Sequence, residues 1–432
     1  MTNFRKSLLV SGMMLGATQA YAAGFQLNSQ SATGIGRAFA GDAVIADNAS
    51  VLSRNPAAMA LFDRAALSTG LTYVDIDVDV KDVNFAGGQV DLGGIDDAGS
   101  SKLIPNIYYV QPLNDQWAFG VAAFSNFGTG TDTSSLLKGA TAAPYDLIGN
   151  TEVTTVTLNA SLSYRINEML SIGAGIDAVY GKGNLTRYAG SIPLVDVDAD
   201  GVGFGGILGA TLELNKDNRF GLSYRFSPTV TVTGDINVMT SQQLPGLGAQ
   251  QIAIDYNELD VPLADILQFA GFHQLTHQFA VHYTAQYTLW DDFDQITTKQ
   301  GTATIASGSY AGMEVATNVK APLKEYHWKN SWLFSVGGTY TVNDTLTLRA
   351  GYMFDNGVVD QLGSLSIPDS DRHWYTLGAS YRLSDSMTID LGAALVRGVE
   401  ESLIETSALA GDVNAHTKST ATYYSMQFNY RF

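Results

Sequence analysis

The chain has 432 residues, no cysteine, and a formal net charge of -18 from 24 Lys plus Arg against 42 Asp plus Glu. This acidity argues against a nucleic-acid partner, because phosphate binding needs a basic face. The absence of cysteine excludes disulfides, thiol nucleophiles and cysteine-ligated metals. Charged residues make up only 15% of the chain, while 44 Gly and 21 Tyr favour strands and turns.

Residues 1–22 have the pattern of a secretory signal. Arg5 and Lys6 give a positive start, residues 8–17 form a short apolar run, and residues 20–22 (Ala-Tyr-Ala) form a cleavage site. We expect cleavage after this triplet. The alternative, an uncleaved anchor, is disfavoured because a spanning helix needs about 20 apolar residues.

Period-two alternation is the main structural signal beyond the leader. It runs through residues 278–289, 374–383 and 423–432, with apolar side chains on one face and mostly polar ones on the other. A soluble sandwich can show the same alternation. An exported chain without a spanning helix can also cross a membrane as a β-barrel, which satisfies all its backbone groups.

Two kinds of connection separate the alternating segments. Six are tight and rich in Asn and Asp, at 113–115, 166–168, 215–218, 290–292, 342–344 and 383–385. Seven are long, at 81–102, 129–150, 190–200, 237–275, 306–326, 355–371 and 400–417. Six and seven connections make thirteen, hence fourteen strands. Short turns at one end and long loops at the other predict an all-β, 14-stranded antiparallel transmembrane β-barrel over residues 65–432.

Residues 23–64 do not alternate, yet they are too apolar for a solvated tail, which is the alternative interpretation. An eight-strand barrel is just filled by its own side chains, so fourteen strands leave a wider lumen. We therefore expect an N-terminal hatch that plugs the barrel, buried through Phe25, Leu27, Ile35, Phe39, Val44, Ile45, Val51, Leu52, Met59, Leu61 and Phe62.

An ordered set of motifs resembles the FadL/TodX-type family of outer-membrane long-chain fatty acid transporters. The motifs extend over the whole mature chain: 23–28 (AGFQLN), 34–38 (GIGRA), 53–57 (SRNPA), 105–106 (PN), 125–128 (SNFG), 187–190 (RYAG), 366–369 (SIPD) with 371–372 (DR), and the aromatic C-terminus.

The resemblance implies passive uptake of long-chain fatty acids across the outer membrane of a Gram-negative cell, with no cofactor and no enzyme activity. In this family a hatch movement opens a route to a lateral hole at a kink in the third strand. The kink corresponds to Asn126, Phe127 and Gly128. A glycine inside a strand suits a bulge, although the residues alone also fit an ordinary loop after Ser125.

The resemblance also implies ligand-binding residues. Arg187 corresponds to the family's carboxylate-binding arginine, Lys329 to a family lysine at the same site, and Phe25 to the phenylalanine that lines it. Two cations in an apolar lumen can hold a carboxylate by charge-assisted hydrogen bonds. From the residues alone, both cations could equally be solvated at strand ends. The hatch motif Asn55, Pro56 and Ala57 is expected to move when the route opens.

The loop at 190–200 is shorter than in the best-known family member, so an outer capture groove would rest on 237–275. The spacing of the apolar residues there suggests a short amphipathic helix after Pro262. Uptake of monoaromatic hydrocarbons, an adhesion barrel, or a barrel enzyme acting on lipids remain alternatives. The expected partners are a hydrophobic small molecule and outer-membrane lipid, and we expect a monomer.

Two groups of residues are candidates for a metal site. Residues 196–201 resemble the start of a calcium loop, but Ile207 stands where an EF-hand needs Glu. His273 and His277 could share a helix face, but no HExxH motif accompanies them. The sequence therefore predicts no metal site.

Overall fold

The computed structural model describes residues 24–140, 142–359 and 362–432. The predicted signal and its cleavage site lie outside these residues. Among the described residues, no helix combines the length and apolar character needed to cross a membrane.

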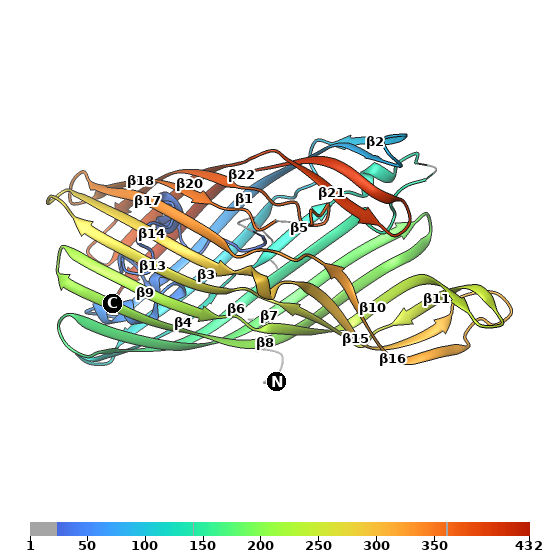
Figure 1. The fold of residues 1–432 in the computed structure, drawn as a ribbon. Helices are drawn as coiled ribbons and strands as arrows, with labels where there is room; N and C mark the ends of the chain where they lie inside the picture. The colour runs from blue at the N-terminus through green and yellow to red at the C-terminus, as the bar shows by residue number, and fades with distance from the viewer. Residues whose placement is uncertain (1–23, 141, 360–361) are drawn as a thin grey trace.

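Fourteen strands form a closed antiparallel barrel, as the sequence predicts (Figure 1). The wall closes where the first strand pairs with the last, from Ala66 opposite Arg431 to Phe85 opposite Val413. In wall order the strands are β1 (Ala66–Phe85), β3 (Lys102–Pro112), β4 (Trp117–Phe124), β6 (Gly149–Arg165), β7 (Leu170–Ala189), β8 (Ile192–Asn215), β9 (Asn218–Phe226), β13 (Asp265–Gln274), β14 (Phe279–Leu289), β17 (Ser331–Thr341), β18 (Leu346–Asp355), β19 (Arg372–Arg382), β20 (Met387–Gly398) and β22 (Gly411–Arg431).

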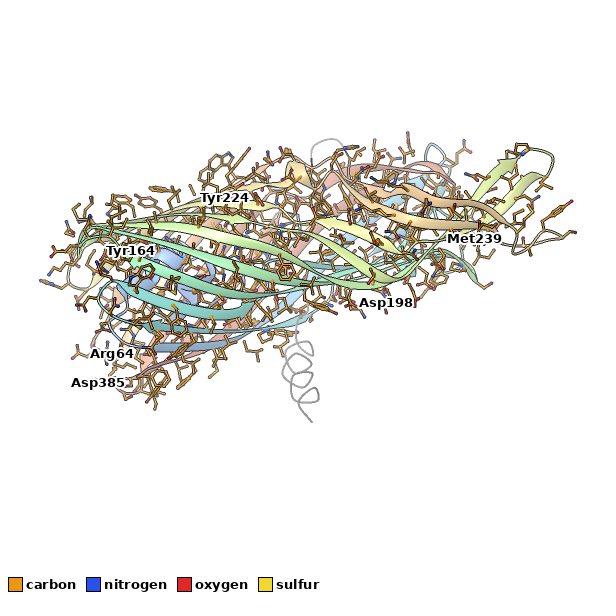
Figure 2. All side chains as sticks on the ribbon, turned by 90° about the horizontal axis from the view of Figure 1, so that it is seen from below. Arg64, Tyr164, Asp198, Tyr224, Met239 and Asp385 are labelled. Carbon is orange, nitrogen blue, oxygen red and sulfur yellow. The ribbon has the colours of Figure 1, made fainter. Side chains whose placement is uncertain are left out.

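The other strands belong to the long connections, which gather at one end of the barrel (Figure 1). Figure 2 shows this end near Met239 and Asp198, opposite the end that carries Arg64, Tyr164 and Asp385. Short turns lie on the periplasmic side in outer-membrane barrels, so the Met239 end faces outward. The additional strands are β2 (Val90–Ile95), β5 (Gly128–Asp132), β10 (Thr229–Leu244), β11 (Gly248–Asp255), β12 (Glu258–Pro262), β15 (Gln295–Ile305), β16 (Glu314–Glu325) and β21 (Glu401–Ser407).

The predicted alternation is confirmed in the wall. On β19, Tyr375 and Leu377 are exposed on the outer face, whereas Trp374 and Thr376 are buried on the inner face. β14 shows the same pattern over its whole length. The outer face is apolar because it meets lipid, and the inner face carries many polar side chains because it meets the plug described below.

One predicted turn is wrong. Residues 290–292 form a short 3-10 helix, η4 (Trp290–Asp292), at the outer end of β14. The periplasmic turn lies at 275–278 instead, where the Thr276 hydroxyl accepts from the amide of Phe279 at 3.1 Å. The predicted number of fourteen wall strands is still correct. β13 lies inside the predicted loop 237–275 but is a wall strand that pairs with β14. β15, which follows residues 290–292 and was expected in the wall, lies outside it.

Two further expectations are wrong. The segment after Pro262 is strand β13 rather than an amphipathic helix, since buried Ile266 and Ala270 alternate with exposed Leu267 and Phe269. Pairing with β9 and β14 enforces this period of two.

Residues 190–200 are not a long loop either. β7 and β8 run together to a tight turn at Gly190, whose φ of 64° suits a residue without a side chain. The acidic residues Asp196, Asp198 and Asp200 therefore lie in strand β8, where they face β7 and β10 rather than form a calcium loop.

The segment from residue 24 to residue 62 lies inside the barrel (Figure 1). It contains α2 (Ala32–Gly36), η1 (Ala49–Ser53) and η2 (Pro56–Leu61). Each begins after a side chain that caps a free backbone amide: Ser31, Asn48 and Asn55. Such caps are needed because buried backbone groups must find partners.

A buried ion network also ties this plug to the wall. Asp47 accepts from Arg37 at 2.9 Å and from Arg349 on β18 at 3.2 Å. Arg37 also pairs with Asp42 at 2.7 Å, and Arg431 donates to the carbonyl of Asp47 at 2.9 Å. Because the partners come from both the plug and the wall, the network fixes one against the other.

Helix α2 packs directly on the backbone of the wall. A Cβ added to Gly378 would lie 2.7 Å from the Cα of Gly36, and a Cβ added to Gly392 would lie 2.4 Å from the carbonyl oxygen of Ala32. Only glycines at these wall positions allow the helix to come so close.

We therefore expect Gly378→Ala to destabilise the folded protein by about 1–3 kcal/mol, the usual cost of overpacking. The measurement is urea unfolding of the detergent-solubilised protein, followed by the mobility shift between folded and heated samples on a gel. Gly183→Ala is the control, since its Cβ would meet only the carbonyl oxygen of Glu152 at 4.0 Å. Equal stability of the two variants would contradict the packing argument.

Candidate ligand-binding site

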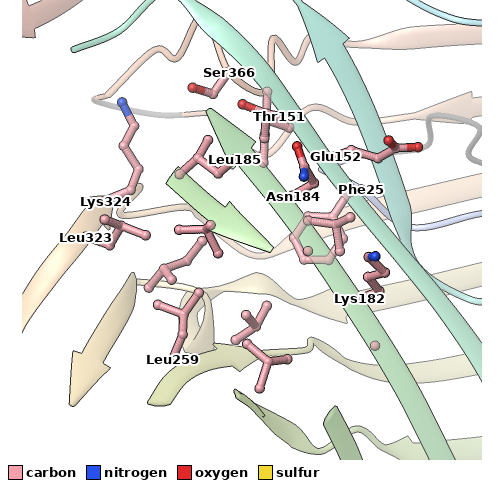
Figure 3. A pocket seen from close by; sticks show the side chains of 18 of the residues that line it. Phe25, Thr151, Glu152, Lys182, Asn184, Leu185, Leu259, Leu323, Lys324 and Ser366 are labelled. Atoms are coloured by element: carbon pink, nitrogen blue, oxygen red, sulfur yellow. The ribbon is translucent and has the colours of Figure 1, made fainter. Parts of the chain in front are cut away.

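A cavity lies in the outer half of the barrel, between the wall strands β6, β7 and β8 and the outer strands β10, β12 and β16 (Figure 3). Its walls are mostly apolar, and one end carries Thr151, Arg187, Lys324 and Ser366. Several apolar residues of the predicted capture region line it, whereas Leu267 and Phe269 do not. The apolar lining comprises Phe25, Val153, Leu185, Val195, Val197, Val230, Val232, Leu259, Val261, Leu263, Phe293, Ile296, Leu323 and Ile367.

Arg187 lies on β7 and is 3% exposed. Its Nη1 donates to the carbonyls of Asn150 and Thr186 at 2.6 and 2.7 Å, and its Nη2 donates to the hydroxyls of Thr151 and Ser366, both at 2.7 Å. All four acceptors are neutral, and within the described residues no carboxylate is in salt-bridge contact with Arg187. An arginine guanidinium keeps its proton in proteins, so the group is charged at neutral pH. A buried cation of this kind is suited to binding an anion.

The structure does not bring Lys329 to this cavity. Lys329 is exposed and lies beside Asn356 and Asp371 in a separate polar pocket. The second cation near Arg187 is Lys324 on β16, whose ammonium pairs with the carboxylate of Glu405 on β21. Burial and then the charge of Arg187 lower the pKa of Lys324 to about 8.

Lys324 lies near the end of β16, which stops at Glu325. Tyr326 and Trp328 follow the strand and are buried, whereas Lys329 is exposed. The prediction of Lys329 rested on a resemblance over residues 328–330, and the structure places Lys324 at the cavity instead.

Phe25 is 1% exposed and is one of the residues that line the cavity (Figure 3). Its ring contacts four others, with centroid distances of 5.8 Å to Phe127, 4.9 Å to Trp290, 5.0 Å to Phe293 and 5.8 Å to Trp328. This aromatic cluster separates the cavity from the part of the wall where Phe127 lies.

The strand is interrupted at residues 125–127, which include Asn126 and Phe127 of the predicted kink. β4 ends at Phe124, and its continuation β5 begins at the third residue of that kink, Gly128, which pairs with Thr154 on β6. β3 pairs with β4 only as far as Ile107 opposite Ala123. A small pocket lies here, lined by Thr69, Pro105, Asn106, Ile107, Ala123, Phe124, Ser125 and Val156.

The start of the plug closes this interruption from the inside. Leu27 donates its amide to the carbonyl of Asn126 at 2.7 Å, and Gly128 donates its amide to the carbonyl of Phe25 at 2.8 Å. Gln26 and Phe127 form an antiparallel bridge. Residues 25–27 therefore act as a short strand laid against the kink.

The motif Asn55, Pro56 and Ala57 lies elsewhere, against β7 and β8. The side-chain amide of Asn55 donates to the carbonyls of Ala43 and Ala210 at 2.8 and 3.0 Å, and its oxygen accepts from the amide of Ala57 at 3.0 Å. The structure thus brings Arg187 and Phe25 to one cavity and places this motif outside the cavity lining.

The family model described as outer membrane protein transport protein (OMPP1/FadL/TodX) matches residues 13–432. The chain belongs to this family. The long-chain fatty acid transport protein of Escherichia coli O6:H1 is 32% identical, over 100% of this chain and 99% of the relative. Outer membrane protein P1 of Haemophilus influenzae strain Rd is also 32% identical, over 100% of both chains.

Solved structures show the same fold. A Pseudomonas aeruginosa FadL homologue superposes with a TM-score of 0.77 at 22% identity, covering 95% of this chain and 100% of the other. A Pseudomonas putida toluene transporter, TodX, gives 0.68 at 19% identity, covering 95% and 100%. With outer-membrane relatives and a membrane-type barrel, this FadL/TodX-family protein is an outer-membrane protein.

The residues considered above as metal ligands have other contacts in the described part of the chain. His273 lies on β13, where it contacts Asn218 and Tyr283, and His277 lies in the turn 275–278, so the two do not share a helix face. Asp198 pairs with Lys182 at 2.9 Å. Among the described residues, no three His, Cys, Asp or Glu side chains are grouped to hold a metal ion.

The aromatic cluster predicts a fluorescence change. Trp290 and Trp328 are 0% and 3% exposed, partly because Phe25 covers them. We expect Phe25→Ala to increase acrylamide quenching of the tryptophan fluorescence about twofold or more, since removing a buried ring costs about 3–5 kcal/mol and loosens its neighbours. The control is Phe269→Ala, a lipid-facing ring without tryptophan contacts. Unchanged quenching in Phe25→Ala would show that the ring does not seal the cluster.

Proposed function

We propose that this protein carries long-chain fatty acids passively across the outer membrane. The observation that supports this most directly is Arg187, a buried cation held only by neutral acceptors at the end of an apolar cavity. An acyl chain matches the walls and a carboxylate matches the cation. The relatives named as long-chain fatty acid transport proteins support the same substrate class.

Binding would exchange one set of contacts for another. A carboxylate at Arg187 replaces the hydroxyls of Ser366 and Thr151, and the new hydrogen bonds are charge-assisted and therefore stronger. Each methylene that leaves water adds about 0.8 kcal/mol. The apolar lining would then supply most of the affinity, and Arg187 would select for acids.

The exit route is proposed to open at the start of the plug. Residues 25–27 close the kink by hydrogen bonds at 2.7 and 2.8 Å, and Phe25 also lines the cavity. Ligand that displaces Phe25 would therefore weaken both closures at once. The sequence-based hypothesis placed the movement around Asn55, Pro56 and Ala57, but the contacts of that motif with β7 and β8 favour movement of residues 25–27.

Transport by this route needs no cofactor and no energy source. Ligand would leave sideways through the gap at Asn126–Gly128 into outer-membrane lipid, and net flux would follow the concentration gradient. One barrel contains the whole route, so a monomer is sufficient. The family and its relatives are named as transporters, and we propose no catalytic step.

A second candidate is uptake of monoaromatic hydrocarbons. The observation that favours it is the cluster of Phe25, Phe127, Trp290, Phe293 and Trp328, whose edge-to-face geometry suits an aromatic guest. A hydrocarbon has no anionic group that Arg187 could bind. The two candidates therefore differ in their dependence on that residue.

Oleate binding to the purified protein should weaken about tenfold or more in Arg187→Gln, because a charge-assisted hydrogen bond is worth about 1.5–3 kcal/mol. Binding of methyl oleate, which lacks the charge, should change little. Both are measured by calorimetry in detergent. If the protein binds toluene, and its oleate affinity is unchanged by Arg187→Gln, the hydrocarbon candidate is favoured.

Oleate affinity should also fall as the pH rises from 7 to 9. The pKa of Lys324 is lowered to about 8, so its ammonium loses its proton in this interval and the end of the cavity loses a positive charge. The effect should be several-fold, absent for methyl oleate, and absent in Lys324→Met. A pH dependence that persists in Lys324→Met would assign the titration to another group.

A further inference from the structure

One cation at the end of the cavity, Lys324, already pairs with a carboxylate of the protein that is not itself part of the lining. Glu405 on β21 is 6% exposed, and its Oε1 pairs with the ammonium of Lys324. Its Oε2 accepts from the amide of Leu365 at 2.6 Å. The carboxylate of Glu405 thus neutralises Lys324, one of the two cations at the site.

The two cations are linked through consecutive residues of one loop. Arg187 donates to the hydroxyl of Ser366, and Leu365, the preceding residue, donates to Glu405, which pairs with Lys324. Two positive groups and one negative group therefore share the end of the cavity. The net charge of these three groups is +1.

The other charged residues nearby contribute less to this net charge. Asp146 also lines the cavity, but it is partly exposed and accepts from Ser407 and Ala408, and Asp132 is exposed. Water and salt screen such charges far better than buried ones. The remaining charged side chains of the lining are paired, Lys182 with Asp198 at 2.9 Å and Glu152 with Lys102 at 3.0 Å.

We propose that Glu405 determines the head-group charge that the site accepts. By holding Lys324 it leaves Arg187 as the acceptor for a singly charged head group, and it excludes doubly charged head groups such as phosphate monoesters. This inference rests on the proposed function, because it assumes that Arg187 binds the ligand's anion. A dianion at this end would keep one uncompensated charge in a buried place, which is strongly unfavourable.

The test compares three probes with the same chain: oleate, oleyl phosphate and oleyl alcohol. At pH 7.4, the wild type should bind oleate at least about tenfold more tightly than oleyl phosphate. In Glu405→Gln the negative charge is lost, while the side-chain oxygen can still accept from Leu365. Oleyl phosphate should then bind about tenfold or more tightly than in the wild type, oleate several-fold more tightly, and oleyl alcohol without change.

Adding Lys324→Met to Glu405→Gln should reverse the gain, since the gain comes from the freed ammonium. The matched control is Asp260→Asn, which removes the carboxylate partner of Lys299 in an ion pair outside the cavity lining. Its affinities should equal those of the wild type.

An equal change for all three probes in Glu405→Gln, or an unchanged ratio of oleyl phosphate to oleate binding, overturns the inference. Oleate binding that is insensitive to Arg187→Gln instead overturns the proposed head-group site. If Glu405→Gln does not fold, Lys324→Gln provides the test, because Glu405 would then oppose Arg187. Oleate should weaken at least about fivefold relative to oleyl alcohol, and an unchanged ratio contradicts the proposal.

Discussion

Hydrogen bonding between the inner face of the wall and the backbone of the plug is the interaction on which the rest of the structure depends. Gln427, Thr284 and Ser68 accept from the amides of Ala32, Gly41 and Ala49, and Tyr108 donates to the carbonyl of Gln30. A wide barrel needs filling, and a segment with little regular structure can fill it only if its polar groups find partners. The alternation of each wall strand supplies those partners inward and the lipid-facing side chains outward.

The positive charges are divided between two regions with different uses. Arg37 and Arg349 pair with the carboxylates of Asp42 and Asp47 where the plug meets the wall, so these charges hold the structure together. Arg187, on the outer side, has only neutral acceptors, so its charge is available to a ligand. The loop that carries Ser366 also carries Asp369, which accepts from the amide of Gly24 at 3.2 Å. Head-group site and plug are therefore joined by one short segment.

Local patterns predicted the wall well and its connections less well. The alternation of β14 and β19 follows from their two faces, one of which meets lipid and the other the plug. Apolar and polar residue types alternate accordingly along the sequence. The turn at 290–292 was mistaken because Asp291 and Asp292 are common turn residues, while the true turn at 275–278 contains no Asn, Asp or Gly. Arg187 and Phe25 were identified by resemblance, and their convergence depends on contacts between distant segments. Lys324 was missed, since Glu405 and Arg187 approach it only in the folded chain.

The short strand at residues 25–27 has a consequence for the permeability barrier of the cell. In the proposed exit step, the carbonyl of Asn126 and the amide of Gly128 would lose their partners next to the membrane, and each unpaired group there costs several kcal/mol. The proposed open form would therefore be high in energy unless a guest stabilised it. Under this proposal the barrel would return to its sealed state once the cargo had passed, and the outer membrane would stay intact without a valve driven by an energy source.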